Sequence, residues 1–411
     1  MARIHSLRAQ SILDSRGNPT IEVTLATSQA EVSATVPSGA SVGVHEALEL
    51  RDDDGKGVSK AIAHLQEIVA PALIGEDLDQ QQLDARLCEL DGTPNKSRLG
   101  ANATLGVSIA FARAEAKERN VPLYAYLGSL DNRTTFSVPE PLFNVLNGGK
   151  HARHGIDIQE CMLAPTGFSS IRERVVVVKK CLSALKSLLE KNGYDTQMGD
   201  EGGFAPALRS NDEGLDLLVE AISQAGYTTD QIQIALDVAA SSLYKDGRYL
   251  LRAGGVDQSL DGEQMSVWYT ALANTYPLIS IEDGFAEDDF DGFAALTKNL
   301  GGALCIVGDD LTVTNVERIQ TAVDKKAVNA CIIKPNQIGT VTETVEAVRA
   351  ARSAGWKVFA SHRSGETMDT FIADFAVGLS CDYLKAGAPT REERSIKYNR
   401  LMEIEDELHA L

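Results

Sequence analysis

The sequence is poor in cysteine and has no long apolar run. Its six cysteines are scattered and include no CxxC pair. They therefore indicate neither a disulfide framework nor a thiolate metal site, and we expect reduced thiols. The first residues lack the apolar core of a signal peptide, and no stretch approaches the roughly 18 apolar residues that a membrane span requires. We expect a cytoplasmic protein with no membrane insertion.

Positive charge is also scarce. The 39 Lys and Arg residues stand against 58 Asp and Glu residues, which gives a net charge of −19. Nucleic acids and anionic membranes require a basic patch, so we expect neither as a partner, although a few local cations could still hold an anionic substrate. The glycine-rich phosphate fingerprints are missing as well, which removes the main support for a dinucleotide-binding or P-loop fold.

The 411 residues, 44% of them hydrophobic, are sufficient for about two to three domains. After the turn-forming residues 15–19, alternation of polar and apolar side chains over 20–25 and 31–36 predicts an antiparallel hairpin. Helical periodicity follows over residues 59–69, 80–90 and 101–117. We interpret residues 1–128 as an α+β capping domain, in which the small-residue segment 37–43 is either a plain connector or a loop that can move.

Past the polar, turn-rich residues 128–139, strands and helices alternate to the end of the chain. Helical patterns recur at residues 171–191, 211–225, 262–275, 341–354 and 366–378. The alternation over 139–411 matches the roughly 250 residues of a closed barrel, whose site lies at the C-terminal ends of its strands. An open doubly wound sheet is the alternative. The fold class is therefore α/β, with an N-terminal α+β domain followed by a TIM-like (β/α)8 barrel.

Four short apolar segments end in charged residues. Three finish in the carboxylates Asp237, Glu282 and Asp309, and the fourth finishes in Lys334, where Pro335 stops it. Each acid alone could simply cap the next helix. Three carboxylates on one rim without a cation would repel each other by several kcal/mol, so we predict a metal site. Oxygen donors without histidine or thiolate favour Mg²⁺ before Mn²⁺ and over Zn²⁺.

Two residues are candidates for acid–base work. Lys334 is a candidate base, because an ammonium beside a divalent cation loses proton affinity, although it could also be a snorkelling surface lysine. Glu201 lies on the glycine-rich turn 199–203, where a substrate can approach the backbone, although the acids of that turn could equally be incidental.

A second group of residues suits an anion. His362, Arg363 and Ser364 follow the predicted strand 357–360, and Lys385 ends another, so this rim carries cations and hydroxyls that fit a phosphate. Arg363 could instead be a helix-entry residue.

The segment from His151 to Glu160 superficially resembles a zinc ligand set on a helix. We reject the helix, because Gly155 and the alternation that follows it indicate a loop and then a strand, so these side chains would not share one face.

The sequence resembles the enolase family over nearly its full length. The resemblance rests on the segments Ser38–Ser41, Glu46–Asp52, Leu99–Ala103, Gly199–Gly203, Ser280–Asp283, Gly308–Leu311, Lys334–Thr340 and Ser361–Thr367. It implies the reversible dehydration of 2-phospho-D-glycerate to phosphoenolpyruvate in glycolysis. It further implies a barrel in which some early strands run antiparallel, a homodimer or a higher assembly of dimers, and two Mg²⁺ sites, one conformational and one catalytic.

The resemblance also implies the roles of individual residues. Lys334 matches the base that takes the C2 proton, and Glu201 matches the acid that protonates the departing C3 hydroxyl; enolase-type sites are known to use a lysine or histidine base with Mg²⁺. The remaining matches are Glu160, His151 and His362 as supporting acid–base residues, Gln159, Ser41, Arg363, Ser364 and Lys385 as substrate contacts, Asp237, Glu282 and Asp309 as ligands of the first Mg²⁺, and Ser41 as a ligand of the second.

Two other interpretations stay open. A diverged paralogue could serve as a structural or surface-binding module, although every implied acid–base and metal position is retained. A related acid-sugar dehydratase or racemase could share the barrel, but that class lacks the motif at 361–364. The departures from the family pattern lie outside the implied catalytic and metal positions and bear on loop closure and substrate affinity; they are Val42, Cys161, Ser242, Met368, Ala386 and Glu392.

Overall fold

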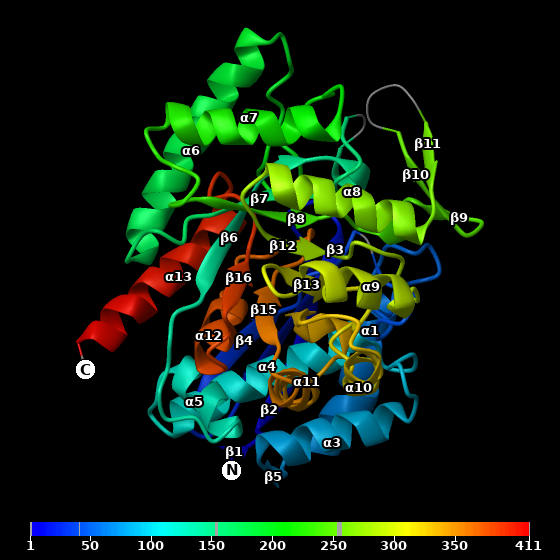
Figure 1. Ribbon diagram of the computed structural model, residues 1–411. Coiled ribbons are helices and arrows are strands. Elements are labelled where there is room, and N and C mark those ends of the chain that lie inside the picture. The colour runs from blue at the N-terminus through cyan, green and yellow to red at the C-terminus, as the bar shows by residue number, and fades with distance from the viewer. Residues whose placement is uncertain (1, 41, 153–154, 253–256, 411) are drawn as a thin grey trace.

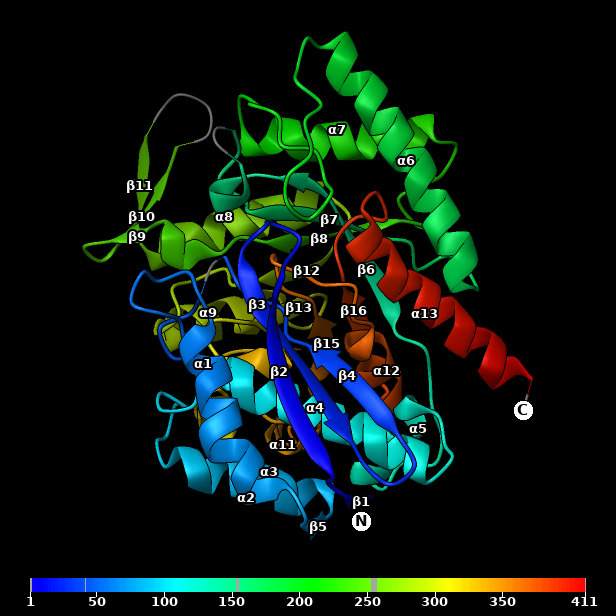
Figure 2. The same cartoon turned by 180° about the vertical axis from the view of Figure 1, so that it is seen from behind.

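The computed structural model describes residues 2–40, 42–152, 155–252 and 257–410 (Figure 1). A small antiparallel sheet with its helices forms the N-terminal part and lies against a large barrel surrounded by helices (Figures 1 and 2). Within the described residues, no helix is both long enough and apolar enough to cross a bilayer.

The N-terminal sheet has the strand order β2 (Ser6–Leu13), β3 (Pro19–Ala26) and β4 (Glu31–Thr35), all antiparallel (Figure 2). The β3–β4 pair confirms the predicted hairpin, and β2 adds a strand that the pattern did not reveal. Asp14 organises the turn between β2 and β3, because its Oδ1 accepts hydrogen bonds from the backbone N–H groups of Arg16 at 2.9 Å and Asn18 at 2.8 Å.

The helices of this part confirm the three predicted segments, extend the first of them through Leu73, and add a last helix, Leu123–Leu130, that was not predicted. They are α1 (Ser59–His64), which runs through the π-helical turn η1 (Leu65–Val69) into α2 (Ala70–Leu73), then α3 (Gln80–Asp91), α4 (Ala101–Glu118) and α5 (Leu123–Leu130). Two short strands, β1 (Ala2–Arg3) and β5 (Asp77–Leu78), pair beside them. Helix α4 is buried on nearly every face, because it packs against β3 and β4 on one side and against the barrel's α11 (Val341–Ser353) on the other.

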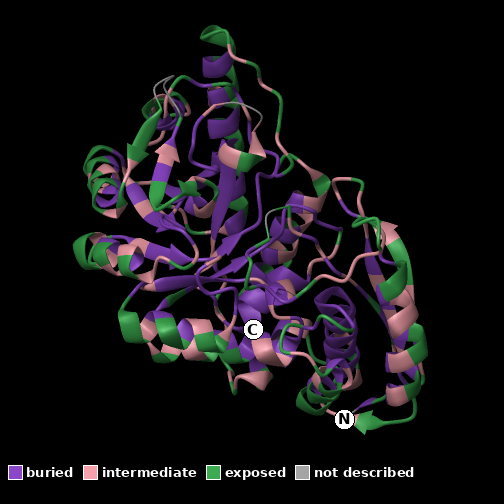
Figure 3. Ribbon diagram, turned by 90° about the vertical axis from the view of Figure 1, so that its right-hand side faces the viewer, coloured by how far each residue is buried: buried purple, intermediate pink, exposed green. Residues whose placement is uncertain are grey.

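The barrel is closed, which rules out the open doubly wound sheet. Its eight strands are, in spatial order, β12 (Leu278–Glu282), β13 (Cys305–Gly308), β14 (Ala330–Ile333), β15 (Lys357–Ser361), β16 (Tyr383–Lys385), β6 (Glu140–Asn147), β7 (Glu160–Ala164) and β8 (Gln233–Asp237). Strand β7 runs antiparallel to both neighbours, whereas the other pairs are parallel. The expectation of antiparallel early strands is thus met by this single strand. The barrel strands form the buried centre of the molecule (Figure 3).

Helices pack around the barrel. Besides α11 they are α6 (Ile171–Lys191), α7 (Asn211–Gln224), α8 (Gly262–Thr275), α9 (Phe290–Leu300), α10 (Val316–Lys325), α12 (Phe371–Gly378) and α13 (Glu392–His409). The short turns η2 (Gly149–His151), η3 (Ala240–Ser242) and η4 (Pro335–Gln337) complete the barrel loops. The predicted bounds of α6 and α8 are confirmed, because Ser170 and Asp261 cap their first turns. A small sheet of β9 (Tyr244–Lys245), β10 (Arg248–Leu251) and β11 (Gln258–Leu260) was not predicted.

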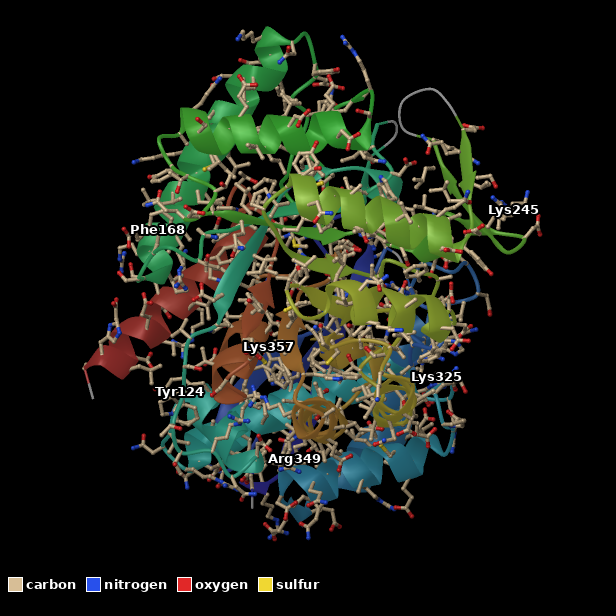
Figure 4. The ribbon with its side chains drawn as sticks, in the orientation of Figure 1. Tyr124, Phe168, Lys245, Lys325, Arg349 and Lys357 are labelled. Carbon is tan, nitrogen blue, oxygen red and sulfur yellow. The ribbon has the colours of Figure 1, made fainter. Side chains whose placement is uncertain are left out.

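The predicted helix at 366–378 begins too early, because residues before Phe371 serve the contact between the barrel and the N-terminal part. Asp369 accepts hydrogen bonds from Arg113 Nη1 at 2.8 Å and Nη2 at 2.5 Å, and from the backbone N–H of Thr35 at 3.0 Å. A second link joins Arg349 of α11 to Asp131, which follows α5, at 2.7 Å (Figure 4).

Breaking the Arg113–Asp369 pair is expected to weaken this contact. Burial alone raises the pKa of Asp369, but the charge and hydrogen bonds of Arg113 hold it below its ordinary value. The pair therefore stabilises the fold above about pH 4, and this contribution is lost as acid protonates Asp369. We expect Arg113→Met to cost about 2–4 kcal/mol at pH 7, allowing for partial exposure of the arginine, and clearly less at pH 3.

Urea unfolding of the variant at both pH values measures this difference. Arg8→Met is the matched control, because Arg8 and Glu31 form an exposed pair at 2.9 Å whose loss should change stability by no more than about 1 kcal/mol. Equal losses in the two variants, or a loss that does not depend on pH, would contradict the assignment.

Candidate active site

The carboxyl ends of the barrel strands surround a cavity lined mainly by charged and polar side chains. Its lining is formed by His151, Gln159, Glu160, Glu201, Asp237, Ala239, Asp283, Asp309, Asp310, Lys334, Ser361, His362, Arg363, Ser364 and Lys385. Most of the residues selected from the sequence are thus brought together. Glu282 lies buried next to this lining, and Ser41 lies outside the described residues.

Strand register places the predicted acids side by side. Asp237 at the end of β8 pairs with Glu282 at the end of β12, and Glu282 pairs in turn with Val307 of β13, two residues before Asp309. The loop after β13 is held by Asp283, whose carboxylate accepts hydrogen bonds from the backbone N–H groups of Asp309 and Asp310, both at 2.9 Å. Asp283 belongs to the segment Ser280–Asp283, which carries part of the family resemblance, but the sequence predicted no structural role for it.

Lys385, at the end of β16, lies among three buried carboxylates, which we call the acidic wall: Glu160, Asp237 and Glu282. Its ammonium lies 2.8 Å from Asp237 Oδ2, 2.9 Å from Glu282 Oε1 and 3.1 Å from Glu160 Oε2. Burial lowers the pKa of Lys385, yet the surrounding carboxylates raise it well above its ordinary value. The lysine therefore stays charged and neutralises part of the wall, a contact that the sequence did not predict.

Lys334, directly after β14, forms a separate ion pair with Asp309 Oδ2. Gln337 of η4 donates to the other oxygen, Asp309 Oδ1, at 2.9 Å. Burial alone lowers the pKa of Lys334, but Asp309 raises it above the usual value. Conversely, burial raises the pKa of Asp309 and the lysine charge lowers it. Each group thus favours the charged form of the other.

Across the barrel, Glu160 and Glu201 are neighbouring carboxylates beside His151. His151 Nδ1 lies 3.5 Å from Glu160 Oε1, and Asn144 of β6 donates to Glu201 Oε2 at 2.9 Å. Burial and the charge of Glu201 raise the pKa of Glu160 well above its ordinary value. Burial also raises the pKa of Glu201, but His362, His151 and Arg394 lower it by more. The net result is a pKa well below the ordinary value. The different surroundings of the two carboxylates thus shift their pKa values in opposite directions.

His151 and Glu160 thus come together, although they come from the turn η2 and the strand β7 and not from one helix. The prediction of a loop followed by a strand is confirmed. The two side chains do not share a helix face, as expected; they meet because the turn η2 folds back over the start of β7.

The rim predicted to hold phosphate contacts the N-terminal part. Arg363 Nη1 donates to Glu46 Oε2 at 2.7 Å and to Asn336 Oδ1 at 3.2 Å. Ser364 Oγ accepts from the backbone N–H of Ala40 at 2.7 Å, so the segment 37–43, predicted as either a plain connector or a loop that can move, touches the rim through Ala40. Glu46 belongs to a quoted motif, but its pairing with Arg363 across more than 300 residues had no local sequence signal.

Among the described residues, two groups bring three possible ligand atoms within 4.8 Å of one another. They are His151, Glu160 and Glu201, and Asp283, Asp309 and Asp310. The predicted trio Asp237, Glu282 and Asp309 is not one of these groups; ammonium groups of Lys385 and Lys334 lie against its members instead. The acidic clusters could bind a metal ion, and the donors of the second one, which follow β12 and β13, are all hard oxygens.

This closed barrel, with carboxylates and lysines facing one another at the strand ends, defines an α/β-barrel enzyme built for proton transfer. Residues 4–127 match the family model of the enolase N-terminal domain, and residues 135–411 match that of the enolase C-terminal TIM barrel domain. The chain is 51% identical to Enolase 1 of Methylococcus capsulatus over 99% of its length and 98% of that protein. It is 48% identical to an enolase of Nitratiruptor sp., with 99% and 97% covered.

The chain therefore belongs to the enolase family. This membership confirms the resemblance, the fold class and the lyase activity, phosphopyruvate hydratase, that were expected from the sequence. A diverged structural or surface-binding paralogue is not favoured, because the identity to curated enolases extends over the whole chain.

Proposed function

We propose that Lys334 removes the C2 proton of 2-phospho-D-glycerate and that Glu201 protonates the departing C3 hydroxyl, giving phosphoenolpyruvate and water. One observation carries this assignment: the two residues line the same cavity from opposite walls. Lys334 follows β14, whereas Glu201 lies near Glu160, which begins β7, and these strands are four apart in a closed barrel of eight. A base and an acid on opposite walls suit removal of a proton and a hydroxyl from opposite faces of a substrate.

The remaining residues have supporting roles. Glu160 and His151 supply and orient the proton on the acid side, and His362 faces Glu201 with 3.4 Å between Nε2 and Oε2. Arg363 and Ser364 contact the phosphate, and Gln159 and Lys385 contact the rest of the substrate. Ser41 completes the site from the loop.

The cofactor is Mg²⁺, at a first site formed by Asp237, Glu282 and Asp309 and at a second site that includes Ser41; one of the two sites is conformational and the other is catalytic. The donor set fits, because carboxylate oxygens at adjacent strand ends are what Mg²⁺ prefers. The Lys334–Asp309 pair also supports the assignment, since Lys334 can act as a base only when another cation neutralises Asp309. When bound, Mg²⁺ supplies positive charge beside the substrate carboxylate, which gains a second negative charge as C2 is deprotonated.

The proposal also covers the domains of the chain, its location in the cell and its assembly. Residues 1–128 form the capping domain, residues 139–411 form the barrel that carries the site, and the enzyme acts in the cytoplasm as a homodimer or a higher assembly of dimers. A concave surface beside the N-terminal sheet supports assembly, because the exposed apolar side chains of Leu13 and Met368 line it together.

The test of the activity is direct. Adding 2-phosphoglycerate and Mg²⁺ to the purified chain should produce the ultraviolet absorbance of phosphoenolpyruvate. A chelator should abolish this signal, and excess Mg²⁺ should restore it. Absence of product with Mg²⁺ present would contradict the proposed function, and turnover that persists in chelator would contradict the metal assignment.

A further inference from the structure

Arg394, near the start of α13, is a fully buried cation with an unusual set of partners. Its Nη1 donates to the backbone carbonyl of Arg363 at 2.7 Å and approaches Nδ1 of His362 at 2.6 Å. Its Nη2 donates to the carbonyls of Ser364 at 2.6 Å and Asp200 at 3.2 Å. The nearest carboxylate, that of Glu393, lies 3.6 Å from Nε. Burial of a permanent charge is costly, so the position indicates a function beyond packing.

The contact with His362 fixes where the imidazole carries its hydrogen. All guanidinium N–H groups are donors, so Nδ1 of His362 must accept, and the hydrogen of the neutral ring then lies on Nε2. Burial and the charge of Arg394 lower the pKa of His362 while Glu201 and Glu366 raise it, and the net result is a pKa of about 4. A doubly protonated ring would also place two N–H groups against each other at this contact.

The free side of the ring faces the cavity. Nε2 lies 3.4 Å from Glu201 Oε2, and among the described residues no hydrogen bond to it is formed. This buried donor is therefore aimed at the carboxylate on the acid side of the site and at the space beside it. Arg394 also ties the backbone before Glu201, at Asp200, to the rim at Ser364, so it fixes the distance between Glu201 and the ring.

We propose that Arg394 is a positioning residue that locks His362 in the neutral tautomer with hydrogen on Nε2. His362 then acts as a fixed hydrogen-bond donor to Glu201 and to the departing hydroxyl, and not as a carrier of protons. The inference deepens the proposed function and rests on the role of Glu201 given there. The orientation of His362 itself rests only on its contacts.

Nuclear magnetic resonance of the whole enzyme with ¹⁵N-labelled histidine tests the tautomer, with the His362 signals assigned by their absence in His362→Gln. We expect an unprotonated Nδ1 and a protonated Nε2 from pH 5.5 to 8.5. Arg394→Met should let the ring titrate near its usual value of about 6.5 or mix its tautomers. Arg394→Lys, which keeps a charged donor, should largely restore the wild-type shifts. A wild-type ring with hydrogen on Nδ1, or unchanged shifts in Arg394→Met, would overturn the proposal.

Kinetics give a second readout. In Arg394→Met we expect kcat to fall about 10- to 100-fold with KM changed less than threefold, because the acid side is misplaced while substrate binding is retained. Exchange of the C2 hydrogen with solvent should persist. An equal loss of exchange and turnover would indicate a general structural role and overturn the proposal.

Arg400→Met is the matched control for loss of a cation from the same helix. Arg400 donates to Asp374 at 2.9 Å and 3.0 Å and pairs with Glu407 at 3.1 Å, and none of these partners acts on the His362 ring. It should leave the His362 shifts unchanged. If the wild type proves inactive on 2-phosphoglycerate, the proposed function fails while the resonance experiment still decides the tautomer. A variant that does not fold leaves the wild-type and Arg394→Lys spectra to decide it.

Discussion

Replacing Lys334 with alanine should abolish exchange of the C2 hydrogen of 2-phosphoglycerate with solvent, whereas Glu201→Gln should keep this exchange and lose dehydration. The separation is expected because the two residues come from opposite sides of the barrel and have different partners. General acid and base groups each contribute about 10²- to 10⁴-fold, so each variant should lose at least that much in the step it serves.

Deuterium incorporation at C2, followed by nuclear magnetic resonance, measures the first step, and the ultraviolet absorbance of the enol product measures the whole reaction. Lys325→Ala is the matched control, because Lys325 forms an exposed ion pair with Asp291 at 3.0 Å on the outer helix α10 (Figure 4). It should retain both signals. Equal rates of exchange in Lys334→Ala and Glu201→Gln would refute the division of roles.

Replacing Lys385 with methionine should destabilise the fold as well as stop turnover. The change removes the ammonium from three buried carboxylates, Glu160, Asp237 and Glu282, and leaves them to repel one another. Removing one partner from a buried ion pair typically costs about 3–5 kcal/mol, and we expect a loss of at least this size without metal. Added Mg²⁺ should recover part of it, because a cation bound to Asp237 and Glu282 would take over their charge.

Thermal unfolding with and without Mg²⁺ measures this effect. Lys357→Met is its control, because Lys357 begins β15 at the opposite end of the barrel and pairs with Asp382 at 2.6 Å with more than half of its side chain exposed (Figure 4). Its loss should cost no more than about 1 kcal/mol and should not respond to Mg²⁺. A small effect in Lys385→Met, or equal effects in both variants, would show that the acidic wall does not depend on this lysine.

Many elements of the fold were readable from local patterns. The first and last residues of α6 and α8 followed from capping residues and a regular apolar face, both of which act over a few residues. The strands that end in Asp237 and Glu282, and the strand followed directly by Lys334, were visible as short apolar runs with an abrupt charge. By contrast, the exposed strands β9–β11 have no distinctive pattern, and the start of α12 was displaced by the contact between Asp369 and Arg113.

The site shows the same division. The residue types at the strand ends identified the chemistry, and the quoted motifs identified the family before any geometry was available. Which cation faces which acid was not readable: Lys385 was assigned to the substrate rim, yet its ammonium lies among Glu160, Asp237 and Glu282. Arg394 had no signal at all, because a buried arginine in a helix rich in charged residues resembles a surface one until its partners are known.

The sequence by itself determined the alternation of elements, the acids and amines at the strand ends, and the membership of the chain in its family, because these depend on residues close together in the chain. Only the tertiary structure decided the closure of the barrel, the reversed direction of β7, and the pairing of Arg363 with Glu46. Those features join residues that lie far apart in sequence, and charge interactions between them depend on distances and burial that exist only after the chain has folded.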